Sequence, residues 1–230
     1  MSGVIGVVET ISAVAAEGRA VLVAHGDWMA WNTLLAMVPL FLATRLFRAD
    51  GKPHTRSARW WLGAAVFVAF LPNAPYVLTD VVHLFADIRT SRHTDLEVLG
   101  LVVPLYLAFF AVGFGCYVLS LQRLRLHLAV TAPALPWWIV ASALHALCAV
   151  GLYLGRVLRF NSWDIVVSPG RLLGTADTLT DAYPLATMLV TFVALVVLTA
   201  MFEVLLDATE RRVRATVAVG RRAIHRFGLR

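Results

Sequence analysis

Charged side chains are scarce in this chain, and their scarcity excludes an ordinary soluble domain. Of 230 residues, 15% are charged and 60% are hydrophobic, whereas charged residues make up about a quarter of a typical soluble domain. The sequence also lacks an HExxH motif, a CxxC pair, a GxSxG serine and a phosphate-binding glycine loop. It therefore predicts a membrane protein and offers no motif for nucleotide binding or for a hydrolytic serine.

Cysteine is nearly absent as well. The two cysteines, Cys116 and Cys148, lie within apolar runs and have no histidine at metal-ligand spacing. We interpret them as small core residues, and we expect no cofactor.

Long apolar runs are what the sequence has in abundance. Windows of about 20 residues, enough to cross about 30 Å of hydrocarbon, lie at Trp28–Leu46, Trp60–Val82, Val98–Leu121, Trp137–Gly155 and Pro184–Leu206. A further segment, Gly3–Ala24, contains charged residues and is either a sixth span or an interfacial helix. The prediction is an all-α, polytopic transmembrane helical bundle of about six helices, the third interrupted by prolines. It forms a single transmembrane domain, residues 1–210, followed by a basic cytoplasmic tail, residues 211–230.

The distribution of charge predicts an orientation. Most of the 20 Lys and Arg residues fall in residues 45–59, 123–125 and 211–230, and the connections between these hold more acids than bases. By the positive-inside rule the basic connections are cytoplasmic. We expect a multi-pass protein of the cell inner membrane with both termini cytoplasmic. Its partners are the lipid bilayer and, at the basic tail, anionic headgroups; we expect no nucleic-acid partner.

Residues 70–87, FLPNAPYVLTDVVHLFAD, place prolines and polar side chains near the middle of a predicted span. One explanation is a proline kink healed by neighbouring helices. The other is a broken helix in which Asn73 caps a second half-helix that begins at Ala74. The polar residues recur at intervals of 3, 4, 3 and 4, which puts them on one helix face: Asn73, Tyr76, Asp80, His83 and Asp87.

A facing partner comes from the apolar run Trp137–Gly155. Arg156 and Arg159 follow at the outer end of the helix face that carries His145 and Cys148. We therefore expect an ion pair between Asp80 and one of the two arginines. The stretches 25–32 and 161–164 supply further polar groups at the same face of the membrane.

Two of these stretches carry a family resemblance. FLPNAPYVLTDVVHL and GLYLGRVLRFNSWD, with WN and AMVPLFLA in the second span, resemble a bacterial family of polytopic membrane proteins, the domain-of-unknown-function family numbered 1361. The likeness runs from about Trp28 to Tyr183. It implies a helical inner-membrane protein, and it implies no reaction, substrate or cofactor. The resemblance marks as signature residues Asn73, Pro75, Tyr76, Asp80, His83, Arg156, Arg159, Asn161 and Asp164.

Three functions remain open at this point. The first is binding or transport of a small polar or anionic ligand at an outer-facing intramembrane site, because paired arginines suit phosphate or carboxylate. The second is a membrane-embedded enzyme acting on a lipid headgroup, in one version with a metal held by Asp80, His83 and Asp87. The third is a structural or accessory role in which the cluster only pairs helices. The expected ligand-binding residues are Asn73, Tyr76, Asp80, His83, Arg156, Arg159, Asn161 and Asp164. The sequence decides neither the ligand nor whether the protein is an enzyme.

Overall fold

The computed structural model describes residues 2–48, 57–90, 98–160, 164–175 and 177–226. These residues are helical almost throughout, as predicted, and include five helices long and apolar enough to cross a membrane. The spans are His25–Leu46, Ala58–Arg89, Gly100–Thr131, Trp137–Arg156 and Ala182–Arg212. The bundle is therefore a polytopic helical one, and its spans coincide with the five long apolar runs.

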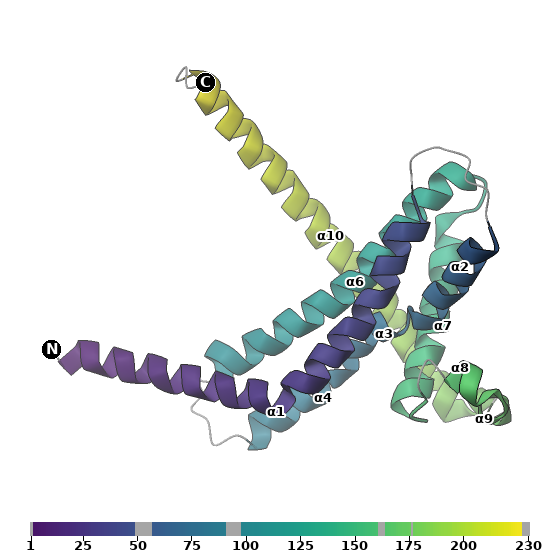
Figure 1. The fold of residues 1–230 in the computed structure, drawn as a ribbon, viewed down its shortest axis with the longest axis horizontal. Coiled ribbons are helices and arrows are strands. Elements are labelled where there is room, and N and C mark those ends of the chain that lie inside the picture. The colour runs from purple at the N-terminus through teal and green to yellow at the C-terminus, as the bar shows by residue number, and fades with distance from the viewer. Residues whose placement is uncertain (1, 49–56, 91–97, 161–163, 176, 227–230) are drawn as a thin grey trace.

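Helix α1 (Ser2–Leu46) contains both the segment Gly3–Ala24 and the first long apolar run. Figure 1 shows that it bends about halfway along, so that its first half leaves the bundle as an arm. At about 1.5 Å per residue, a 45-residue helix is far longer than one bilayer is thick. Gly3–Ala24 is thus helical, but it extends another span and is not a separate helix.

The span Ala58–Arg89 is divided into several short pieces. It consists of α2 (Ala58–Phe70), α3 (Asn73–Tyr76), the 3-10 turn η1 (Val77–Asp80) and α4 (Val81–Thr90). The proline interruption predicted for this span is confirmed. A π-helical turn, η2 (Val98–Val102), then leads into α6 (Val103–Thr131).

Helix α6 forms the centre of the bundle. Its fully buried side chains include Tyr106, Tyr117 and Leu121, and it packs mainly against α1. Gly113 lets α3 and η1 come close to it, because a Cβ at that position would collide with the side chain of Val77. The interrupted span is thereby held against the best-buried helix.

The remaining elements are α7 to α10, which form one end and one side of the bundle. Helix α7 (Trp137–Arg156) is followed by α8 (Asp164–Val167), α9 (Pro169–Gly174) and η3 (Asp177–Thr180). Helix α10 (Ala182–Arg226) packs chiefly on α7 and otherwise presents exposed apolar side chains. It runs without a break from the last span into the basic tail. In Figure 1, α8, α9 and the end of α4 lie at one end, and the C-terminal end of α1 and the start of α2 lie at the other.

Candidate functional site

The interruption after α2 keeps right-handed helical backbone angles. Leu71, Pro72, Val77 and Val81 all have αR values of φ and ψ. The backbone N–H groups of Ala74 and Tyr76 donate to the carbonyls of Leu71 and Pro72 at 3.2 and 3.1 Å. The backbone therefore stays helical and hydrogen-bonded as it passes the prolines.

Asn73 heals the interruption and does not cap a new helix. Its Nδ2 donates to the carbonyl oxygen of Phe70 at 3.1 Å, and the residue before α3 is Pro72, which offers no side-chain cap. The broken-helix interpretation with Asn73 as an N-cap is thus wrong. The physical reason is that Pro75 has no N–H to donate to the carbonyl of Leu71. The N–H of Ala74 donates there instead, and the Asn73 amide donates to the carbonyl of Phe70 that Ala74 leaves free.

Two glycines bring α7 close to this interruption. A Cβ on Gly151 would lie 2.7 Å from Cβ and Cγ of Pro72, and one on Gly155 would lie 3.2 Å from Cε2 of Tyr76. Small residues four apart commonly allow such close approach between membrane helices. They hold the end of α7 beside α3.

Asp80 is the buried acid at this junction, with only 2% of its surface exposed. Its Oδ2 accepts a hydrogen bond of 3.0 Å from Nδ2 of Asn32. Its Oδ1 lies 3.5 Å from Nη1 of Arg156 and 3.9 Å from Nε2 of His83. The predicted ion pair therefore exists, but at a long distance, and one carboxylate is shared by three neighbours.

Arg159 differs from its predicted position. Helix α7 ends at Arg156, and Arg159 follows it with φ of 57° in the left-handed region. Beyond it, the N–H of Phe160 donates back to the carbonyl of Leu154 at 3.0 Å. Arg159 is exposed and does not share the α7 face that buries His145 and Cys148. The expected common face fails because the helix stops before it reaches this residue.

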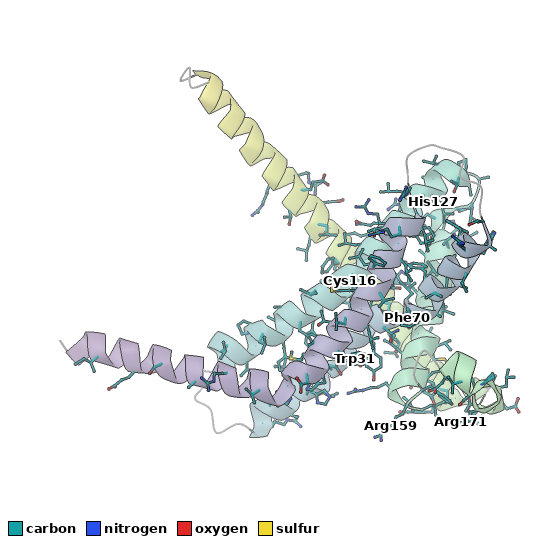
Figure 2. All side chains as sticks on the ribbon, in the orientation of Figure 1. Trp31, Phe70, Cys116, His127, Arg159 and Arg171 are labelled. Carbon is teal, nitrogen blue, oxygen red and sulfur yellow. The ribbon has the colours of Figure 1, made fainter. Side chains whose placement is uncertain are left out.

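A cavity of about 1310 Å³ lies between α1, the interrupted span and α7. Polar and basic side chains line one part of it: Asn32, Asn73, Tyr76, His83, Arg156 and Arg159. Apolar side chains from α1, α2 and α7 line the rest, among them Trp31, Trp61 and Leu147. Figure 2 shows Trp31 on α1 and Arg159 beyond the end of α7, with His127 far away at the opposite end. Five of the expected ligand residues therefore line one cavity: Asn73, Tyr76, His83, Arg156 and Arg159. Asp80 does not line it but contacts Arg156.

A second polar cluster lies beside this cavity and contains Asp87. Its Oδ1 lies 3.1 Å from Nε2 of His25, and its Oδ2 accepts a 2.7 Å hydrogen bond from the hydroxyl of Tyr106. The indole N–H of Trp28 donates to Nδ1 of His25 at 3.1 Å, so Nε2 of His25 donates to Asp87. The ring of Trp28 also lies 5.0 Å from that of His83, which links the two clusters.

The alternative metal site is not assembled by this arrangement. Asp80 turns toward Arg156, whereas Asp87 turns toward His25 and Tyr106. Within the described residues, no three His, Cys, Asp or Glu side chains gather closely enough to hold an ion. The prediction fails because Asp80 and Asp87 lie two helical turns apart, about 10 Å along the axis at about 1.5 Å per residue, and each contacts other side chains.

The last two expected residues lie apart from the cavity or outside the description. Asn161 falls in residues 161–163, which the structure does not describe. Asp164 begins α8 and is half-buried, and it does not line the cavity. Sequence reasoning missed the apolar lining, although the pair Gly151 and Gly155 was a usable signal of helix contact.

Comparison with known proteins agrees with the resemblance. A family model described as "Protein of unknown function (DUF1361)" matches residues 31–198. The match includes every described residue that lines the cavity and leaves out the α1 arm and the basic tail. No curated protein and no solved structure matches the chain.

Proposed function

The chain belongs to the DUF1361 family of proteins of unknown function, and from the geometry of its cavity we propose that it binds a small anionic ligand at the outer face of the membrane. The single observation that carries this proposal is an excess of positive charge in the cavity. Arg156 and Arg159 both line it, while Asp80, the carboxylate that Arg156 approaches, is already shared. A ligand that brings negative charge restores the balance.

The arginines differ in how far they are neutralised. Arg156 approaches Asp80 at 3.5 Å and its side chain keeps 33% of its surface exposed. In the described part of the chain, no carboxylate pairs with Arg159. A guanidinium presents several N–H groups in a plane and binds phosphate or carboxylate oxygens in pairs. The two arginines therefore provide an anion site that the protein's own acids do not fill.

Neutral polar groups complete the same part of the cavity. Tyr76 supplies a hydroxyl and His83 an imidazole, and both line the wall next to the arginines. Groups of this kind fix the orientation of a ligand held mainly by charge. The proposed site thus combines two cations with groups that hydrogen-bond to polar substituents.

The orientation in the membrane follows from charge. Arg45 and Arg48 lie at or just after the C-terminal end of α1, and Arg123 and Arg125 lie toward the C-terminal end of α6. In Figure 1 these ends and the C-terminal end of α10 lie away from α8 and α9. The positive-inside rule supports a cytoplasmic location for those ends. The polar part of the cavity then opens toward the outer face of the inner membrane.

Binding of inorganic phosphate to the purified full-length protein tests the proposal. Trp31 and Trp61 line the cavity, so tryptophan emission reports on occupancy during a titration at constant ionic strength. We expect saturable binding that weakens about tenfold in Arg159→Gln, the loss of about 1.4 kcal/mol that one charge-assisted contact supplies. The matched control is Arg123→Gln, an exposed arginine on α6 near the opposite end. Equal titrations for all three proteins contradict the proposal.

A further inference from the structure

We infer that the anionic ligand is the headgroup of an amphiphile whose hydrocarbon chain lies between α2 and α7. This inference rests on the proposed anion site and adds a substrate class to it: lipids with a phosphate group. It starts from a feature that a small ion does not explain. Away from the arginines the cavity is lined by apolar side chains, including Trp61, Ala65, Val68, Leu147 and Val150.

The size of the cavity favours a ligand larger than a small ion. Its volume of about 1310 Å³ exceeds the range of about 300–1,000 Å³ that is typical of small-molecule pockets. From Arg156 to Leu147 the α7 wall runs roughly 14 Å at about 1.5 Å per residue. One leaflet contributes about half of the 30 Å hydrocarbon thickness. The apolar wall on α7 is therefore about one leaflet deep, and on α2 the lining continues as far as Trp61, near the start of that helix.

The apolar part is also open to the side. Trp61, Val68 and Leu147 are 56%, 38% and 40% exposed while lining the cavity. Around a membrane-spanning helix, such exposure faces hydrocarbon. A chain can thus enter from the bilayer while its headgroup moves along the interface to the arginines. This route removes no charged group from water, whereas a charge that crosses hydrocarbon costs several kcal/mol.

Charge and apolar lining together define one occupant. The arginines select an anionic headgroup, and the groove beneath them, lined mainly by apolar side chains, accepts a hydrocarbon chain. A zwitterionic lipid fills the groove equally well, but it brings a positive group to the arginines. The arrangement thus favours a lipid with an exposed phosphate monoester, for which phosphatidic acid is a suitable probe.

The test compares probes that share a headgroup and differ in chain length. Native mass spectrometry of the full-length protein measures binding of glycerol 3-phosphate, short-chain phosphatidic acid and long-chain phosphatidic acid, with phosphatidylcholine of equal chain length as the neutral reference. We expect phosphatidic acid to bind more tightly than glycerol 3-phosphate, by up to about fourfold for each CH2 group that a monomeric short-chain lipid transfers from water to the groove, and to bind more tightly than phosphatidylcholine. Arg159→Gln is expected to lower the affinity for all three phosphates.

A groove substitution separates the chain from the headgroup. Ala65 lines the groove from α2 and is exposed, so Ala65→Trp fills the groove without entering the core. It is expected to abolish the chain-length dependence and to keep glycerol 3-phosphate binding. Ala146→Trp is the matched control, because Ala146 is exposed on α7 and does not line the cavity.

Each alternative outcome has a distinct meaning. Affinity that depends on Arg159 but not on chain length overturns the amphiphile and leaves the anion site intact. Chain dependence that survives in Ala65→Trp overturns the groove as the place of the chain. Binding that is insensitive to Arg159→Gln, or equal for phosphatidic acid and phosphatidylcholine, overturns both the amphiphile and the proposed anion site.

Discussion

Asp80 and Arg156 meet at 3.5 Å between the interrupted span and the end of α7, and the acid is 2% exposed while the arginine side chain is 33% exposed. Asp80 also accepts the side-chain amide of Asn32 on α1. Three spans are thus joined at one carboxylate. The pair has two roles, because it fixes the helices and also sets how much positive charge remains for a ligand.

A double-mutant cycle separates these roles. Arg156→Ala leaves the buried Asp80 carboxylate without its cation, and we expect a loss of roughly 2–3 kcal/mol in unfolding free energy, below the range for fully buried pairs because Arg156 is partly exposed. Asp80→Asn in the same chain removes the uncompensated charge and should recover part of that loss. Unfolding in detergent micelles measures both. Additive effects of the two substitutions contradict a direct pairing.

The contact between Gly151 and Pro72 predicts a steric effect. In Gly151→Ala the new Cβ lies 2.7 Å from the proline ring, which cannot rotate away, so we expect a loss of about 1–3 kcal/mol. Gly26→Ala is the control, because nothing lies within 4 Å of its added Cβ. There the higher helix propensity of alanine should stabilise α1 by up to about 1 kcal/mol. Thermal unfolding measures the change in stability of both variants, which we expect to have opposite signs. If Gly151→Ala loses no stability, α7 lies farther from the interruption than the structure shows.

Arg159 allows stability and binding to be separated. Its φ of 57° favours glycine, so Arg159→Gly should raise the unfolding free energy by about 1 kcal/mol. Arg159→Gln keeps the backbone strain and should leave stability unchanged. Both variants lack the guanidinium and should bind phosphate more weakly. If Arg159→Gly binds as well as the wild type, Arg159 is not a ligand residue.

The hydrogen bond between Tyr106 and Asp87 in the second cluster should contribute to the stability of the protein. Its ring is fully buried and its hydroxyl donates to Asp87 at 2.7 Å, and a hydrogen bond to a charged group contributes about 1.5–3 kcal/mol. Tyr106→Phe should lower the unfolding free energy by that amount. Tyr183→Phe, at a residue that is 70% exposed, should have little effect. Equal results for the two variants contradict a structural role for the hydroxyl.

Span lengths and the Asp80 pair could be predicted from the sequence because each depends on a simple constraint. Bilayer thickness fixes the length of apolar runs, and a buried acid at the depth of two arginines requires a cation. Both constraints act without details of the backbone. The interruption at Pro72 and Pro75 was predictable as well, because proline lacks the backbone N–H that a regular helix needs.

The remaining features depend on local backbone geometry that spacing does not encode. The 3-4-3-4 pattern assumes one continuous α-helix, whereas the span is interrupted at Pro72 and winds as a 3-10 turn in η1. Asp87 contacts His25 and Tyr106 and does not line the cavity. Asn73 donates to Phe70 because a particular carbonyl is freed there. The apolar lining could not be predicted from the sequence, because an apolar residue such as Trp61 or Leu147 can face either lipid or a cavity.

The orientation that places the cavity outside can be tested with single cysteines. Thr178→Cys lies in η3 near the cavity end, and Ala134→Cys lies in the turn between α6 and α7 at the opposite end; both positions are exposed. The native Cys116 and Cys148 are buried, so they should give little background. In intact cells without an outer membrane barrier, an impermeant maleimide should label position 178 and not 134, and inside-out vesicles should reverse the result. Labelling of 134 from outside places the arginines of the cavity at the cytoplasmic face, where an outer-leaflet lipid cannot reach them.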